Sequence, residues 1–294
     1  MIHLVVAIST PLMLAATGGL MTKLAGVLNI GLEGMILVGA FAAILGASAT
    51  GSAIVGLMAA GAAGTLFALI FAVIVLRLKA NLFIAGLGIN LLAVGATASL
   101  SSLLFSTRGV VSVSNLTVPL YRIPLVDSVP IIGEIVSGHT FFAPLAWIVV
   151  VAAALFVRNS TSGLELQATG IDEDVVAARG LNPSRYRVLA ILFSGVTCGI
   201  AGAALSLELG AFVPNMSGGR GWIALVAVFL GQKRFTAVSA VALLFAAAEY
   251  GANSLQGTLH LPRTLALSVP YLVTLVGMVV FGAIGKAQAR NKGE

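Results

Sequence analysis

A few charged and amide side chains stand inside stretches of sequence that are otherwise apolar. Glu33 falls in the run NIGLEGM at 29–35, Asn90 ends the run GLGIN at 86–90, and Arg220 directly precedes an apolar segment. A charge at the middle of a bilayer costs at least about 2.5–3.5 kcal/mol, so such residues usually face a protein interior or a wet cavity. Hydrogen-bonding groups in that position suit a small polar solute crossing the membrane. We predict a translocation pathway lined by Asn29, Glu33, Asn90, Asn215, Ser217 and Arg220.

Two of these residues have a structural alternative. Glu33 stands early in its apolar stretch, where it could form an ion pair between helices. The amide of Asn90 could bond to a neighbouring helix, since a buried amide needs hydrogen-bond partners. Both alternatives stay open at this point.

Catalytic motifs are missing from the sequence. No Lys is followed by Ser or Thr, so there is no phosphate-binding loop of the Walker A type, and neither HExxH nor GxSxG occurs. Cys198 is the single cysteine, which excludes a disulfide within the chain and a cysteine-rich metal site. We expect a protein that is not an enzyme in its own right and that holds no cofactor.

The composition places the chain in a lipid bilayer. Of its 294 residues, 59% are hydrophobic and 9% charged, and the mean hydropathy is +1.08, whereas a soluble domain carries about 25% charge. The net charge of +6 is better explained by basic loops that orient a membrane protein than by nucleic-acid binding. The expected fold class is all-α and polytopic, with one membrane domain covering 1–294.

Helical spans account for nearly all of the chain. A span needs about 20 apolar residues, and the predicted ones are 4–20, 28–48, 54–76, 82–105, 141–157, 188–208, 221–231, 235–251 and 264–285. The stretch 221–231 is too short to cross, so it is either a re-entrant half-helix or one part of a broken helix. We therefore expect about 8–10 helices. Small residues at Gly56, Ala60 and Gly64 predict close helix packing.

The basic residues orient these spans. With the N-terminus outside, most of the 16 Lys and Arg fall on the inner side. This leaves an external loop at 106–140 and a cytoplasmic loop at 158–187.

Two apolar segments resemble each other and predict an inverted repeat. The run 33–41 aligns with 220–228, where Gly34 matches Gly221 and Ile36 matches Ile223. By the charge count the first run starts inside and the second outside. Transporters built from inverted repeats place their substrate near broken helices at the repeat interface.

The cytoplasmic loop contains the signals of a short helix at 172–180. Asp172 can cap its start and Gly180 can end it, while Pro183 suits the first position of the next helix. This helix would expose Val175, Val176, Ala177 and Ala178. Because two turns are marginal alone, it must pack either on this chain or in a groove of a cytoplasmic partner.

Several runs resemble one known family. They are GVLNIGLEGMILVGAF at 26–41, GLGIN at 86–90, the stretch 168–180, the stretch 194–203 and MSGGRGWIA at 216–224. Together they cover nearly the whole chain and resemble permease subunits of bacterial ABC importers in the branched-chain amino acid, ribose and nucleoside group. The similarity is greatest to the shorter of two paired nucleoside-type, or simple-sugar-type, permeases. The turn at 231–235 departs from a Gly/Pro-rich turn common in relatives.

The resemblance implies an assembly in the bacterial plasma (inner) membrane. A second permease, a longer relative, would complete the pathway. Two cytoplasmic ATPases, or one tandem ATPase, would carry ATP and Mg, and an external binding protein would deliver the solute. The family's coupling region matches Gly170, Asp172, Asp174, Ala177, Ala178, Gly180 and Pro183.

The expected solute is a nucleoside, which is neutral and aromatic and suits a pathway with few charges. A ribose-like sugar or a branched-chain amino acid is the alternative within the family. An ion-coupled secondary transporter is the alternative from another class, favoured only by Glu33 and the repeat.

Overall fold

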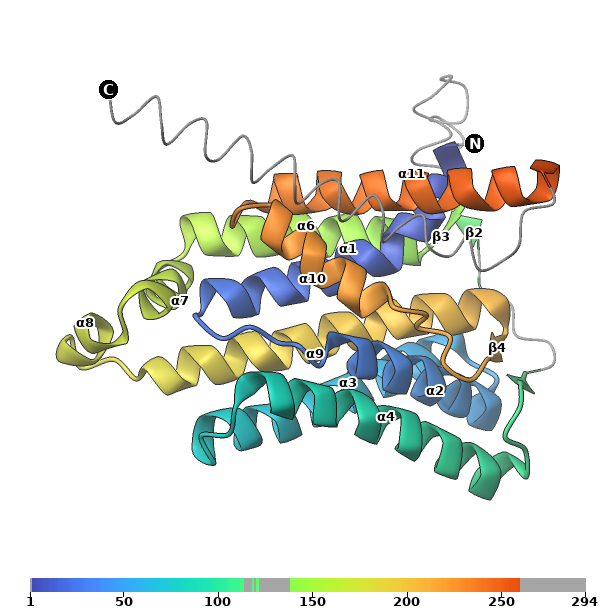
Figure 1. Ribbon diagram of the computed structural model, residues 1–294, viewed down its shortest axis with the longest axis horizontal. Helices are drawn as coiled ribbons and strands as arrows, with labels where there is room; N and C mark the ends of the chain where they lie inside the picture. The colour runs from blue at the N-terminus through green and yellow to red at the C-terminus, as the bar shows by residue number, and fades with distance from the viewer. Residues whose placement is uncertain (1, 114–117, 119, 122–137, 260–294) are drawn as a thin grey trace.

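The computed structural model describes residues 2–113, 118, 120–121 and 138–259. Long helices run along a common axis (Figure 1). They are α1 (Ile2–Leu24), α2 (Leu32–Thr50), α3 (Ala53–Ala72), α4 (Leu82–Phe105), α6 (Phe142–Asn159), α9 (Pro183–Leu209) and α11 (Phe235–Leu259). The shorter elements are the π-helical turn η1 (Val73–Arg77), α7 (Thr161–Ile171), α8 (Glu173–Ala178) and α10 (Arg220–Leu230).

Four two-residue strands lie at the end of the bundle opposite α8. β1 (Val111–Ser112) pairs antiparallel with β4 (Ala211–Phe212), and β2 (Leu120–Tyr121) pairs antiparallel with β3 (His139–Thr140). β1 follows α4 and pairs with β4, which lies between α9 and α10, and β3 directly precedes α6 (Figure 1).

The prediction of an all-α polytopic membrane protein is confirmed. Seven helices in the described part are long and apolar enough to cross a membrane. Each corresponds to one predicted span. The stretch 221–231 forms α10, which has only 11 residues and is a separate helix from α11. The predicted span 264–285 and most of the external loop 106–140 lie outside the described residues.

Glycines let α9 pack at the centre of the bundle against α1, α2 and α3. A Cβ atom at Gly199 would lie 2.2 Å from the carbonyl oxygen of Ala60, and one at Gly202 would lie 2.1 Å from that of Ile36. On α3, a Cβ at Gly64 would lie 2.2 Å from the carbonyl oxygen of Gly195. The small-residue packing predicted for α3 is therefore present, and it brings helix backbones into contact.

One side of the bundle is apolar and exposed. The exposed side chains of α3 and α4 include Leu66, Leu69, Ile84, Leu91 and Leu103, and Leu103 is 77% exposed. Such a surface suits contact with lipid tails.

Candidate functional site

The helix pattern breaks between α1 and α2, at 25–31. Asn29 is fully buried there, and its Nδ2 donates a hydrogen bond to Oγ of Ser194 over 2.7 Å. Its Oδ1 accepts one from the backbone N–H of Gly31 over 2.9 Å. Ser194 lies near the middle of α9. The irregular segment therefore crosses the middle of the bundle rather than running outside it.

Asn90 of α4 fixes the same segment from the other side. Its Oδ1 accepts a hydrogen bond from the N–H of Gly34 over 2.8 Å, and its Nδ2 donates one to the carbonyl oxygen of Ile30 over 3.2 Å. The interhelical hydrogen bond considered for Asn90 is therefore present. It gives partners to backbone groups that a broken helix leaves without them.

Glu33 joins the first turn of α2 to the start of α10. Its Oε1 accepts from the backbone N–H of Gly219 over 2.8 Å, and its Oε2 accepts from the N–H of Gly221 over 2.7 Å. A Cβ at Gly221 would lie 2.4 Å from the Glu33 nitrogen, so only glycine allows this approach. A carboxylate is favourable at the positive end of a helix. The partner of Glu33 is thus backbone, and among the described residues neither oxygen makes the ion pair that the sequence left open.

A cation lies at the opposite end of α10. The Nζ of Lys23, in the last turn of α1, donates a hydrogen bond to the carbonyl oxygen of Val228 over 3.0 Å. The same ammonium lies 4.6 Å from the centre of the Phe229 ring. The short helix therefore has a carboxylate at its N-terminus and an ammonium at its C-terminus, which complements its dipole at both ends.

The remaining candidates lie in and before the first turn of α10. Arg220 forms an ion pair with Glu249 of α11 over 2.9 Å. Ser217 is fully buried, and its Oγ has no hydrogen-bond partner in the described part of the chain. Asn215 is exposed, with φ at +58°. Five of the six candidates therefore meet where α2 and α10 begin, and Asn215 lies in the loop beside them.

Three contributors to this junction were not singled out from the sequence. Ser194 and Glu249 are partners of Asn29 and Arg220, and Lys23 is the partner of Val228 at the other end of α10; each stands far along the chain from the residue that it contacts. The sequence shows the charge or hydroxyl of each residue, but it does not show which distant residue each one contacts.

The predicted helix at 172–180 is present as α8 and has the expected ends. Oδ1 of Asp172 accepts hydrogen bonds from the N–H of Asp174 over 3.0 Å and of Val175 over 3.2 Å. Gly180 ends the helix with φ at +77°, and Pro183 starts α9. The rest of the predicted loop also folds, because 161–171 form α7.

One detail of this prediction is wrong. Val176 is 3% exposed rather than presented outward. A helix of six residues must bury one apolar side chain against its own chain to be stable, and α8 contacts α7 and α9. Val175, Ala177 and Ala178 are exposed as predicted.

Gly170 connects this region to the break in the membrane. It lies in the last turns of α7, and a Cβ there would be 2.0 Å from the carbonyl oxygen of Leu24 and 2.8 Å from the nitrogen of Gly26. Gly26 begins the irregular segment and has φ at +80°. The end of α7, which leads into α8, therefore contacts the start of the 25–31 segment directly.

Comparison with known proteins identifies the family. Residues 1–284 match the model described as the permease component of the branched-chain amino acid transport system. The chain belongs to this family of ABC permeases. It is a membrane-embedded, non-catalytic subunit of an ABC importer in the plasma membrane, and the family gives no reason to expect a cofactor in it. This membership replaces the alternative of a self-contained ion-coupled transporter.

Curated relatives match most of the length of the chain. The guanosine ABC transporter permease protein NupQ of Bacillus subtilis is 29% identical over 96% of this chain and 91% of its own. The nucleoside ABC transporter permease protein NupC of Lactococcus lactis is 28% identical over 96% and 91%. TsgC13 of Haloferax volcanii, whose name assigns it to glucose ABC transport, is 34% identical over 83% and 74%.

A solved structure shares the fold. PsaBC from Streptococcus pneumoniae, in complex with Fab, aligns with a TM-score of 0.55 at 12% identity, covering 94% of this chain and 90% of that one. An identity this low supports the likeness of the fold and nothing further.

We expect Glu33→Gln to destabilise the junction. The carbonyl oxygen of glutamine can accept from only one of the N–H groups of Gly219 and Gly221, and its NH₂ group would face the other. A hydrogen bond to a charged group contributes about 1.5–3 kcal/mol. The melting temperature of the purified permease complex should fall, and uptake should fall with it. The control is Glu173→Gln, which removes the exposed pair with Arg187, a contact of about 0–1 kcal/mol. Equal melting temperatures for both variants would contradict this role of Glu33.

Proposed function

We propose that this chain forms one half of the translocation pathway of a nucleoside importer, and that the pathway runs along the face where α2 and α10 begin. The observation that carries the proposal is the meeting of two irregular segments, 25–31 and 213–219, at the middle of the bundle through Glu33. Irregular backbone at membrane depth is tolerated only where protein covers it or where it lines a water-filled cavity.

The arrangement of α2 and α10 supports an inverted repeat. Both helices begin at the Glu33 junction and run toward opposite ends of the bundle (Figure 1). At about 1.5 Å per residue, the 11 residues of α10 span about 16 Å, roughly half of the hydrocarbon core. We propose that α10 is a half-helix whose counterpart is the first part of α2.

Exposure distinguishes the pathway face from the lipid face. Gly26, Asn215 and Gly218 are exposed on the irregular segments. On α10, Trp222 is 38% exposed and Phe229 is 50% exposed, and seven residues apart they share one side of the helix. Tryptophan favours the membrane interfaces over the bilayer centre, so a Trp near the middle of the bundle suits a cavity better than lipid.

Five of the six candidate residues then divide into two roles. We propose that Asn215 and Arg220 contribute to the pathway surface, with Trp222 beside them, whereas Ser217 is fully buried and takes no part in that surface. The polar groups of Asn29, Glu33 and Asn90 form hydrogen bonds with other residues of this chain. Their part is to hold the two helix starts in place.

Coupling to ATP hydrolysis is proposed to pass through α8. The exposed side chains Val175, Ala177 and Ala178 offer an apolar surface on a capped helix, which suits a groove on an ATPase. Movement of α8 reaches the pathway through α7 and the contact of Gly170 with Gly26. The partners we propose are a longer second permease, two ATPases or a tandem one, and an external binding protein.

The two relatives named for guanosine and nucleoside transport, matched over nearly the whole chain, support a nucleoside as the solute. An exposed aromatic ring on α10 is compatible with stacking on a base. The relative named for glucose transport keeps a sugar as the second candidate. A branched-chain amino acid has only the family's description in its favour.

The substrate is tested with the native complex and its binding protein. In proteoliposomes loaded with ATP, labelled guanosine, adenosine and uridine should be taken up, while glucose and ribose in excess should not compete. The isolated binding protein should show the same preference, with binding of guanosine and no binding of glucose. Uptake of sugar alone would overturn the nucleoside assignment and leave the permease assignment intact.

The pathway face is tested by the reactivity of introduced cysteines, since the native Cys198 is fully buried. Asn215→Cys and Trp222→Cys should react with a membrane-impermeant methanethiosulfonate in the assembled complex, because a thiol ionises and reacts only in water. Leu91→Cys, on the exposed apolar side of α4, is the matched control and should stay unmodified. A Trp222→Cys variant as unreactive as the control would contradict the proposed face.

Coupling is tested with Ala178→Asp. The variant places a charge on the exposed apolar surface of α8, where its desolvation would oppose docking. ATP-driven uptake and capture of the ATPase should be lost, while the melting temperature of the permease stays that of the wild type. Thr161→Asp adds the same charge at an exposed position in the first turn of α7, and it should leave both readouts unchanged. Normal uptake and normal ATPase capture by Ala178→Asp would refute the role of α8.

A further inference from the structure

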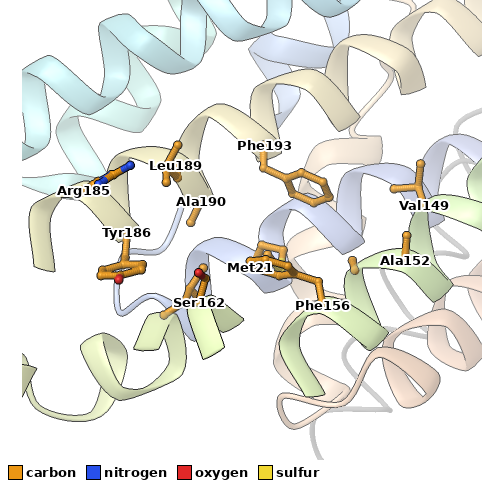
Figure 2. Close-up of a pocket in the computed structure, with 12 residues that line it drawn as sticks. Met21, Val149, Ala152, Phe156, Ser162, Arg185, Tyr186, Leu189, Ala190 and Phe193 are labelled. Atoms are coloured by element: carbon orange, nitrogen blue, oxygen red, sulfur yellow. The ribbon is translucent and has the colours of Figure 1, made fainter. Parts of the chain in front are cut away.

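An elongated pocket of about 530 Å³ lies between α1, α6, α7 and α9, and none of the six candidate pathway residues lines it (Figure 2). Side chains from all four helices form its walls. Nothing in the transport role derived above uses this space.

Polarity changes along the pocket. Arg185, Tyr186 and Ser162 lie together at one end, and Phe193 and Val149 lie at the other (Figure 2). Arg185 to Phe193 covers eight steps of α9, which is about 12 Å along the helix axis. One leaflet of the hydrocarbon core is about 15 Å deep. The pocket is therefore polar at one end, where the cation of Arg185 stands next to Tyr186, and it is apolar for nearly the depth of a leaflet. The hydroxyl of Tyr186 donates a hydrogen bond to the carboxylate of Glu165.

The polar end lies where the helices leave the membrane. Arg185 follows Pro183, the first residue of α9, and Ser162 is the second residue of α7. Arg185 is exposed and makes no ion pair within the described residues, whereas Arg187 pairs with Glu173. The pocket also opens sideways, because Phe156 is 40% exposed and Leu189 is 51% exposed.

We infer that this pocket is a binding site for an anionic phospholipid. One acyl chain occupies the apolar length between α6 and α9, and the phosphate pairs with the guanidinium of Arg185. The orientation predicted from the basic residues places this end in the cytoplasmic leaflet, which carries the anionic lipids. The site is independent of the solute that the importer carries.

The lipid has a consequence for coupling. Ser162 and Leu166 give α7 one wall of the pocket, and α7 carries Gly170 and leads into α8. An acyl chain in the pocket therefore packs against α7 and stabilises the position in which Gly170 contacts Gly26.

The inference is tested on the whole complex purified in a neutral detergent, with palmitoyl-oleoyl phosphatidylglycerol and phosphatidylcholine as probes. Native mass spectrometry should show phosphatidylglycerol retained by the wild type. Arg185→Gln should weaken its binding about fivefold, the effect of about one surface charge. It should weaken phosphatidylcholine binding less, because the choline ammonium already offsets the charge of that lipid's phosphate. Leu189→Trp, which fills the pocket, should remove both lipids.

Two matched controls separate the site from general effects. Arg77→Gln removes an exposed cation at the same end of the bundle, and Leu91→Trp adds an indole to the exposed side of α4. Both should retain phosphatidylglycerol like the wild type. Uptake in phosphatidylglycerol proteoliposomes should exceed that in phosphatidylcholine for the wild type, and this difference should vanish in Leu189→Trp, whose melting temperature in phosphatidylcholine reports its folding.

Three outcomes would overturn the inference. The first is equal phosphatidylglycerol retention by the wild type, Arg185→Gln and Leu189→Trp. The second is a loss of phosphatidylcholine equal to that of phosphatidylglycerol in Arg185→Gln, which removes the headgroup contact. The third is a disulfide between Leu189→Cys and a cysteine placed in the 264–285 stretch, which would show that the chain itself fills the pocket.

Discussion

The carboxylate of Glu33 accepts hydrogen bonds from two backbone N–H groups inside the helix bundle. A bilayer offers no hydrogen-bond partners, so each broken helix end must find them within the protein. Glu33 supplies them for the start of α10, while Asn29 and Asn90 supply them for the start of α2. The irregular segments are stable because these three side chains give hydrogen-bond partners to their backbone groups.

Close packing gives these bonds their geometry. Glycines on α2, α3 and α9 bring the backbones of the three helices into contact, which fixes Ser194 beside Asn29. Gly221 allows α10 to reach Glu33, and Lys23 holds the far end of the helix. An element of 11 residues, too short to cross the membrane or to be stable alone, is thereby held from both ends.

The same break links the membrane to the region outside it. Gly170 of α7 lies against Leu24 and Gly26, where the irregular segment begins. In the coupling route that we propose, a displacement of α7 and α8 reaches the 25–31 segment directly, because the backbone of Gly170 lies against those of Leu24 and Gly26. A rigid contact of this kind transmits movement where a flexible loop would absorb it.

Composition and hydropathy determined the membrane class, the position of each described span and the short length of 221–231, because a bilayer imposes apolar length on any helix that crosses it. The caps of α8 were equally readable, since Asp172 and Gly180 act on neighbouring backbone. The sequence could not show that Val176 turns inward, nor that Glu33 accepts from N–H groups 186 and 188 residues away instead of pairing with a cation. Only the tertiary structure decided such partners, because a backbone N–H carries no sequence signature and its distance depends on how every helix packs.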